Sequence, residues 1–213
     1  MGRINMIDRQ ASETVPGHRV DYAGSKMGMW IFLFTELLFF GGMFLLYSVF
    51  RSKYAPDFHA SAGELNVFFG TANTAILLTS STTMALSIAL LRKGEHRFSM
   101  FCQLITIALG LVFLFNKYIE WGVHISSGIY PHSPALEQMA RGKVIFFSLY
   151  YVMTGIHGIH VLIGVCAILG MLFFTAKGII HQTDFVKLEN TGLYWHFVDI
   201  IWIYLFPLFY LIT

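Results

Sequence analysis

Five long runs of apolar residues dominate the chain, and shorter polar segments separate them. Each run exceeds the roughly 20 residues that a helix needs to cross the hydrocarbon core of a bilayer. The fourth run is long enough to require a tilted helix, or a helical end that stands outside the membrane. The pattern predicts an all-α integral membrane protein with a bundle of five transmembrane helices. We place these helices at residues 27–50, 65–91, 98–125, 144–176 and 191–212.

Polar segments with turn-forming residues mark the breaks between the runs. Residues 92–97 are a short charged connection, and residues 126–134 combine Ser, Gly and Pro. Residues 1–26 are polar and of mixed charge. They hold no apolar core followed by a cleavage site of small residues, which argues against a secretory signal peptide. We therefore divide the chain into an N-terminal tail, residues 1–26, and a five-helix transmembrane domain, residues 27–213.

Composition agrees with a membrane protein and narrows its partners. The sequence is 56% hydrophobic and 12% charged, which excludes a disordered chain and is extreme for a soluble domain. A net charge of +2 gives no reason to expect nucleic acid as a partner. Cys102 and Cys166 both fall in apolar runs, where a thiol usually packs as a small hydrophobic group.

The distribution of Lys and Arg predicts the orientation in the membrane. Nine of these residues fall on the side that holds the N-terminal tail, and four fall on the opposite side. The remaining cation, Lys117, lies inside the third run. By the positive-inside rule, we expect the N-terminus to be cytoplasmic and the C-terminus to lie outside.

Ionisable and amide side chains interrupt the apolar runs, although each charged group inside a membrane helix costs roughly 2.5–3.5 kcal/mol. On the third run Asn116, Glu120 and His124 share one helical face, and Lys117 can neutralise Glu120 three residues later. Because polar groups need partners in lipid, we expect a lattice of hydrogen bonds that ties the helices together. Its predicted members are Asn73, Glu120, His157, His160, Glu189, His196 and Asp199.

A metal or haem site is the sharper alternative for these histidines and carboxylates, because such groups on facing helices can hold iron. The Glu-x-x-His repeat of di-iron bundles is absent, and the nearest pair, Glu120 and His124, is four residues apart. We therefore assign no metal ligand, no cofactor-binding residue and no catalytic residue to this chain.

Glu36 differs from the other acidic residues. It lies in the middle of the first run among Phe and Leu residues, with no Lys or Arg within two helical turns along the sequence. Removal from water disfavours the charged form of a carboxyl, so we expect Glu36 to be neutral. Two interpretations remain open: a structural hydrogen bond, or a role in proton handling or contact with a lipid head group.

Several motifs occur in one order along the chain. They are Thr-Glu-Leu-Leu-Phe-Phe at 35–40, Asn-Thr at 73–74, Tyr118 with Glu120, Thr-Gly-Ile-His-Gly-Ile-His-Val at 154–161, and Glu189 seven residues ahead of His196 in Trp-His-Phe-Val-Asp at 195–199. In these motifs, from about residue 27 to residue 211, the chain resembles subunit III of the haem-copper oxidases, the cytochrome c oxidase family, in its short five-helix prokaryotic form.

The resemblance implies an accessory subunit of a proton-pumping terminal oxidase. Such a subunit binds no haem or copper, packs on subunit I, and supports proton uptake near the proton path of subunit I. It implies haem and copper in the partner subunits, subunit II and other respiratory subunits as further partners, and the cytoplasmic membrane of a prokaryote as the location. Bound phospholipid is also implied, in a cleft against two N-terminal helices that the short form lacks. The loop at 131–143 departs from the usual pattern.

Other functions remain open at this point. A quinol oxidase subunit III and an accessory protein of a nitric oxide reductase would look similar; Glu36 followed by Phe39 and Phe40 favours the cytochrome c type. A small proton-coupled transporter is the more remote alternative. That alternative predicts discontinuous helices or an internal repeat, and the sequence has no recognisable repeat.

Overall fold

A computed structural model describes residues 22–131, 133–181 and 184–211. Five helices in this part of the chain are long and apolar enough to cross a membrane, as the sequence predicts. They are α1 (Tyr22–Lys53), α3 (Val67–Arg92), α4 (His96–Ser126), α6 (Arg141–Ala176) and α7 (Val186–Phe206). Two short helices, α2 (Ala55–Ala62) and α5 (Pro134–Glu137), lie between them, and a π-helical turn, η1 (Pro207–Leu211), follows α7.

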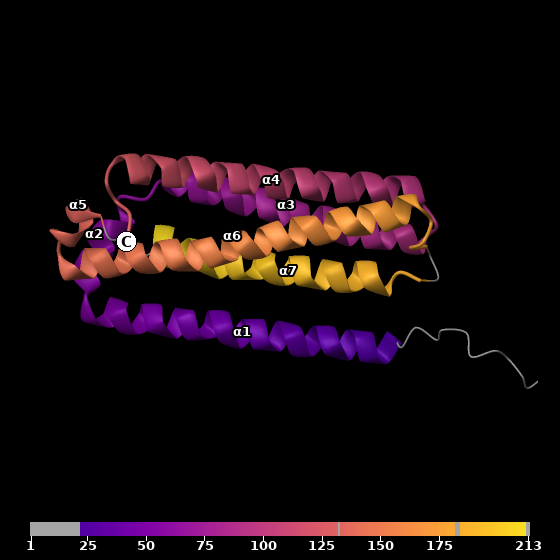
Figure 1. Cartoon of the computed structure of the whole chain (residues 1–213), viewed down its shortest axis with the longest axis horizontal. Coiled ribbons are helices and arrows are strands. Elements are labelled where there is room, and N and C mark those ends of the chain that lie inside the picture. The colour runs from indigo at the N-terminus through magenta and orange to yellow at the C-terminus, as the bar shows by residue number, and fades with distance from the viewer. Residues whose placement is uncertain (1–21, 132, 182–183, 212–213) are drawn as a thin grey trace, which may run out of the picture.

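The long helices alternate in direction, and α1 lies at one side of the bundle (Figure 1). Helices α3, α4, α6 and α7 pack together, whereas α1 touches α7, α6 and α2. In its most apolar window α1 has 11% of its residues buried, against 56% in α7. Helix α7 is therefore the centre of the fold, and α1 presents most of its apolar side chains to the surroundings.

Local signals explain where the helices begin and end. The Asn66 side chain caps α3 by accepting a hydrogen bond from the backbone N–H of Phe68 at 2.9 Å. Gly94, with φ of 84°, takes the left-handed conformation that closes the turn between α3 and α4. That tight connection holds α3 and α4 side by side.

Two of the helices begin about five residues before their predicted starts. Helix α7 begins at Val186 rather than at 191, because Lys187 and Glu189 break the apolar run but not the helix. Helix α1 begins at Tyr22, so residues 22–26 of the predicted tail are helical. The rest of that tail, 1–21, lies outside the described residues. The short helices α2 and α5 were not predicted.

Helix α6 has 36 residues and is about 54 Å long at 1.5 Å per residue, well beyond a hydrocarbon core of about 30 Å. Its first turn is tied to α2, where the Gly142 N–H donates to the Asp57 carboxylate at 3.1 Å. Next to this bond, Lys143 pairs with Glu64 at 2.5 Å. The extra length of α6 thus serves to fasten the short helices at this end of the bundle.

Tryptophans of α7 fill the centre, and small residues of the neighbouring helices make room for them. A Cβ atom on Gly110 of α4 or on Gly164 of α6 would lie within 2.8 Å of the Trp195 ring. Close approach at small residues is typical of membrane helix pairs. Gly164 thus lets α7 approach α6 closely, whereas a Cβ atom on Gly158 would meet only Leu114, at 4.0 Å.

Candidate functional site

Glu36 and His160 form an acid–base pair between α1 and α6. The Glu36 Oε2 and His160 Nε2 atoms are 3.1 Å apart, near the middle of both helices. Their side chains are 21% and 15% exposed, so the pair lies at the margin of the bundle rather than inside it. His160, which was predicted to belong to the polar lattice, and Glu36, which was not, therefore belong to one site.

The other ring nitrogen of His160 determines where the proton can be. Nδ1 lies 2.8 Å from the backbone carbonyl oxygen of Ile156, and a carbonyl oxygen only accepts, so Nδ1 carries a proton. In a neutral ring, Nε2 then accepts a hydrogen bond from a protonated Glu36. In a charged ring, Nε2 donates to an ionised Glu36. In both forms a single proton lies between Glu36 and His160.

Aromatic residues from α1 and α7 hold the His160 ring. The Phe40 ring meets it edge-on at 5.2 Å between centroids, and the Tyr194 ring stacks on it at 6.5 Å. The Tyr194 hydroxyl also donates to the His160 backbone carbonyl at 3.1 Å. Three helices therefore fix the geometry of the pair.

Glu36 has no Lys or Arg within two helical turns along the sequence, but it has a histidine partner from a distant helix. His160 is 124 positions away in the sequence, and a search within two helical turns of Glu36 could not find it. Each of the two residues could be recognised in the sequence as an ionisable group at the middle of an apolar run. Sequence alone does not tell which faces of two distant helices meet.

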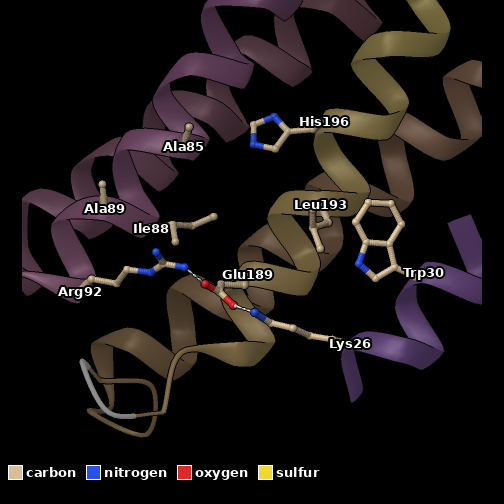
Figure 2. Close-up of a pocket in the computed structure, with 9 residues that line it drawn as sticks. All are labelled: Lys26, Trp30, Ala85, Ile88, Ala89, Arg92, Glu189, Leu193 and His196. Atoms are coloured by element: carbon tan, nitrogen blue, oxygen red, sulfur yellow. Dashed lines mark ion pairs between the residues drawn. The ribbon is translucent and has the colours of Figure 1, made fainter. Parts of the chain in front are cut away.

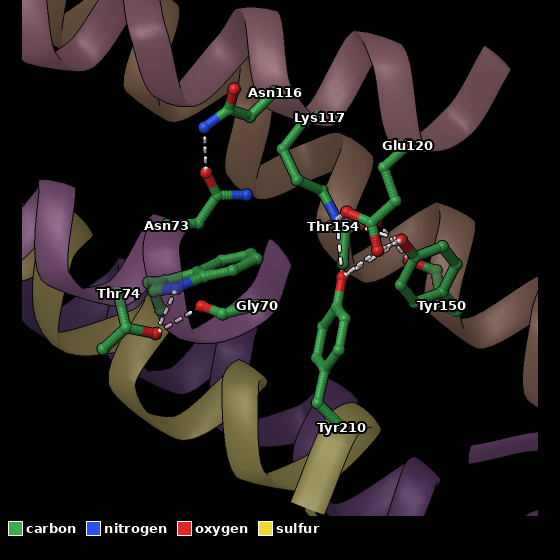
Figure 3. Close-up of polar contacts among 10 residues, drawn as sticks. Gly70, Asn73, Thr74, Asn116, Lys117, Glu120, Tyr150, Thr154 and Tyr210 are labelled. Carbon is green, nitrogen blue, oxygen red and sulfur yellow. Dashed lines mark hydrogen bonds and ion pairs between the residues drawn. The ribbon is translucent and has the colours of Figure 1, made fainter. Parts of the chain in front are cut away.

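A second acid–base pair, Lys117 with Glu120, lies inside the bundle on α4 (Figure 3). Lys117 Nζ donates to Glu120 at 2.8 Å, to the Tyr150 hydroxyl at 2.9 Å and to the Tyr210 hydroxyl at 3.0 Å. Tyr150 donates to the other Glu120 oxygen at 3.0 Å, and Tyr210 donates to that same oxygen. Lys117 is 7% and Glu120 is 4% exposed. Every donor has an acceptor, and the neutralisation of Glu120 by Lys117 is confirmed.

The two tyrosines of this cluster were not among the predicted polar residues, because both lie within apolar runs and read as core aromatics. The turn η1 carries Tyr210 to Lys117 across 93 positions. Figure 3 also shows the bond between Asn116 Nδ2 and the Asn73 side chain, at 2.9 Å. That bond between α4 and α3 is a lattice contact of the kind the sequence predicts.

Three polar residues of α7 lie in different surroundings: Glu189, His196 and Asp199. Glu189 pairs with Lys26 at 2.9 Å and also with Arg92. The His196 Nδ1 atom lies 2.6 Å from the Ser81 hydroxyl of α3. Both carboxyl oxygens of Asp199 are buried without a hydrogen-bond partner among the described residues. The three side chains do not form one site.

The predicted lattice is wrong for His157. His157 is fully buried, and neither ring nitrogen has a hydrogen-bond partner in the part of the chain that the structure describes. Its ring lies edge-on to Phe113 at 5.5 Å and beside Trp202 at 5.3 Å. Aromatic rings occupy the space in which a polar partner was expected.

The alternative of a metal centre finds no geometric support among residues 22–131, 133–181 and 184–211. Nowhere in these ranges do three or more His, Cys, Asp or Glu side chains come together as a metal site would need. The absence of metal from the chain itself stays a prediction.

Comparisons with known proteins agree on one family. The family model for cytochrome c oxidase subunit III matches residues 8–213. A cytochrome c oxidase subunit 3 of Thermostichus vulcanus is 32% identical over 209 residues, with 97% of both chains covered. A probable quinol oxidase subunit 3 of Staphylococcus haemolyticus is 32% identical over 190 residues, covering 88% of this chain and 89% of the relative. A cytochrome c oxidase subunit 3 of Synechocystis is 32% identical over 186 residues, covering 87% of this chain and 74% of the relative. The five apolar helices, the ordered motifs and these matches together show that the chain belongs to the cytochrome c oxidase subunit III family of the haem-copper oxidases.

Proposed function

We propose that this chain is the non-redox subunit of a haem-copper terminal oxidase, that it packs on the haem-bearing subunit I, and that it supports proton uptake there. As a member of its family, the chain is a multi-pass membrane protein that associates with other oxidase subunits. The proposal places it in the cytoplasmic membrane of a prokaryote, with the N-terminus cytoplasmic and with subunit II among its further partners. Haem and copper belong to the partner subunits.

The partners of the ionisable side chains support a non-redox role. His160 is engaged with Glu36, His196 with Ser81, and Glu120 with Lys117. These bonds engage His160, Glu120 and one ring nitrogen of His196, and the ring of His157 is enclosed by Phe113 and Trp202. Purified alone in detergent, the full chain should show no Soret band; a haem spectrum that disappears in His157→Ala or His196→Ala would contradict the proposal.

The single observation that supports a proton role is the Glu36–His160 pair. It holds one proton between two titratable groups in the membrane interior, and both groups are partly open at the edge of the bundle. With its one proton the pair is neutral overall, and it can pass protons on with no net charge left in the bilayer when each proton taken up is matched by one released. The Lys117–Glu120 pair is more deeply buried and is held by two tyrosine hydroxyls, so we assign it to stability.

The test uses the assembled oxidase with Glu36→Gln. The glutamine can still hydrogen-bond to the His160 ring but cannot lose a proton. We expect the initial rate of electron transfer to be nearly unchanged, because this chain holds no redox centre, and proton uptake or sustained turnover to fall. Stopped-flow spectroscopy and a pH-indicator dye measure the two quantities.

Glu95→Gln is the matched control, because Glu95 is an exposed carboxylate in the turn between α3 and α4. It should leave both quantities unchanged. Normal proton uptake together with undiminished turnover in Glu36→Gln would contradict the proton role, although not the membership of the family.

The electron donor is the point on which a second candidate is supported. Relatives named cytochrome c oxidase and quinol oxidase match at the same identity, so a quinol oxidase subunit III is also supported. The chains that co-purify decide between them: a copper-bearing subunit II indicates cytochrome c, and its absence indicates quinol. The transporter alternative predicts broken helices, and the five described spanning helices each run without a break.

A further inference from the structure

Asp199 is a carboxyl in the interior of the bundle whose hydrogen-bonding capacity is not used. It lies on α7, the central helix, and is 2% exposed. Neither of its carboxyl oxygens has a hydrogen-bond partner among the described residues. An ionised carboxylate without a partner is very costly in such a place, so the carboxyl stays neutral by holding a proton. That proton needs an acceptor close by.

The polar side chain beside the Asp199 carboxyl is Ser81 of α3. The last torsion of an aspartate is broad, so a rotation of the carboxyl can complete a hydrogen bond to the Ser81 hydroxyl. That hydroxyl is in turn 2.6 Å from Nδ1 of His196. His196 precedes Asp199 by three residues, so both side chains leave α7 on the same face. Since a hydroxyl can donate one hydrogen bond and accept another, Ser81 can join Asp199 to His196.

His196 connects these buried groups to open space. A cavity of about 430 Å³ lies between the start of α1, the end of α3 and the first turns of α7, and its lining includes Lys26, Arg92, Glu189 and His196 (Figure 2). The side chains of Lys26 and Arg92 are 44% and 53% exposed, so the cavity is open at these helix ends. Asp199 does not line the cavity. The carboxyl therefore lies behind His196, and His196 lies at the cavity.

We propose that Asp199 takes up and releases a proton through Ser81 and His196, and that these three side chains form a proton-storage site that opens on this cavity. With the proton stored, the Asp199 carboxyl donates to the Ser81 oxygen, and the Ser81 hydroxyl donates to Nδ1 of His196. Nε2 of the neutral imidazole then carries its proton on the cavity side.

Release of the stored proton moves one proton along each bond. The carboxyl proton passes to the Ser81 oxygen, the hydroxyl proton passes to Nδ1 of His196, and the Nε2 proton passes to a water molecule in the cavity. One proton leaves the site, Asp199 keeps one negative charge, and the His196 ring changes its tautomer but stays neutral. The carboxylate now accepts from Ser81, and Ser81 accepts from Nδ1. Uptake is the reverse of these steps.

The path ends at Asp199. Three residues farther along α7, the Trp202 indole N–H donates to the Thr74 hydroxyl at 3.0 Å. An indole N–H only donates, so it cannot pass a proton on. The site therefore returns each proton to the cavity from which it came, as a store does and a channel does not.

Ionisable side chains that face α7 from the elements packed against it are engaged elsewhere. They are Lys26 and Arg92 with Glu189, Glu36 with His160, Tyr210 with Glu120, and His157 between Phe113 and Trp202. The storage site therefore exchanges its proton independently of the Glu36–His160 pair.

The test follows the carboxyl C=O band of Asp199 in the full chain in lipid nanodiscs, by time-resolved infrared spectroscopy after transfer from water to heavy water at pH 7. Isotope-labelled aspartate shifts aspartate bands alone, so Glu36 does not interfere, and Asp199→Asn assigns the band. We expect the band of a protonated carboxyl, which exchanges its proton for a deuteron. Ser81→Ala and His196→Phe should each slow this exchange about tenfold, the effect that one lost hydrogen bond has on a rate.

Two variants separate the storage site from a general disturbance of α3. Ser81→Thr keeps the hydroxyl and should keep the fast exchange. Thr82→Val is the matched control, because the exposed Thr82 hydroxyl donates to the Leu78 carbonyl of its own helix at 3.0 Å, and it should leave the exchange unchanged. The isotope label keeps the assignment possible if Asp199→Asn does not fold, since the other described aspartates lie outside the spanning helices.

Three outcomes would overturn the proposal. A spectrum without a protonated aspartate band would show that Asp199 holds no proton. A band that does not exchange in the parent chain would make Asp199 an enclosed structural group. Equally fast exchange in Ser81→Ala and His196→Phe would mean that the proton takes another route.

The inference deepens the proposed role in proton uptake, because a store at the end of the bundle that we place toward the cytoplasm can supply protons there. The two fail separately. Slow exchange in Ser81→Ala, together with normal proton uptake by the assembled oxidase that carries this variant, would retain the storage site and exclude its use by the oxidase.

Discussion

The bundle contains two acid–base pairs that differ in how completely they are enclosed. Lys117 and Glu120 come from one helix and share two tyrosine hydroxyls, so their hydrogen-bonding groups are satisfied inside the protein. Glu36 and His160 come from two helices and have one contact with each other. The first pair is also more deeply buried, with Lys117 7% and Glu120 4% exposed, whereas the second is partly open.

The difference teaches that the number of surrounding partners separates a structural pair from a reactive one. A buried charge with three hydrogen-bonded neighbours is held in one state, because any change of protonation breaks several bonds at once. A pair with a single shared proton can change its state at the cost of one bond. The two pairs therefore make different predictions for stability and for proton transfer.

The largest predicted effect concerns orientation, which is all or none. If the N-terminus is cytoplasmic, the Lys117–Glu120 pair lies toward the outer side of the membrane, and the turn between α3 and α4 faces the cytoplasm. A cysteine in place of the exposed Lys93 should then react with an impermeant maleimide only from the cytoplasmic side. Labelling from outside in intact cells would reverse the assignment.

The next largest effect is expected when one member of the Lys117–Glu120 pair is removed. Lys117→Met leaves Glu120 buried without its cation, and we expect about 3–5 kcal/mol of destabilisation. Thermal unfolding in detergent, followed by circular dichroism, measures it. Lys117→Met combined with Glu120→Gln should recover much of the loss, because no uncompensated charge remains; a double variant as unstable as the single one would contradict the comparison.

A smaller effect on stability is expected at the Glu36–His160 pair. Glu36→Gln keeps a donor to His160, so stability should change by about 1 kcal/mol or less. Separated charges are costly in hydrocarbon, and the shared proton should therefore rest on the carboxyl at pH 7. Infrared difference spectra should show a protonated carboxyl C=O band that Glu36→Gln lacks. If the parent protein has no such band, Glu36 is ionised and the proton resides on His160.

The smallest effect is expected at His157. Its side chain is buried, as Lys117 and Glu120 are, but its ring nitrogens make no hydrogen bond with the described residues. His157→Phe removes two unsatisfied nitrogens and keeps a ring against Phe113 and Trp202. We expect unfolding stability to be unchanged or slightly higher. A loss of more than about 2 kcal/mol would mean that a nitrogen of His157 has a polar partner after all.

The sequence was informative wherever the relevant spacing lay within one helix. The five apolar runs predicted five spanning helices, and the spacing of Lys117 and Glu120 predicted their pairing. Contacts between distant helices were not predictable in this way. The pairing of Glu36 with His160 depends on which faces of α1 and α6 meet, and Tyr210 reaches Lys117 through a π-helical turn that has no recognised sequence signal.

The failure of the predicted lattice has a physical reason. The rule that polar groups in lipid find partners was applied to each side chain separately, whereas packing decides which partners are within reach. Large aromatic side chains surround His157 and leave its ring nitrogens without a partner among the described residues. A residue pattern reveals that a group is polar, but not what the opposing helix offers at the same depth.

The peripheral position of α1 has a consequence for biosynthesis. α1 is the first spanning helix of this bundle to leave the ribosome, yet its hydrogen-bond partners come late in the chain. Ser25 is bonded to Asn190 at 2.9 Å, and the Tyr47 hydroxyl donates to the Leu208 carbonyl at 2.5 Å, 161 positions away. Helix α1 can meet His160 once α6 has been translated, but its two ends gain these bonds only with α7 and η1, and a chain that stops before Asn190 lacks both of them.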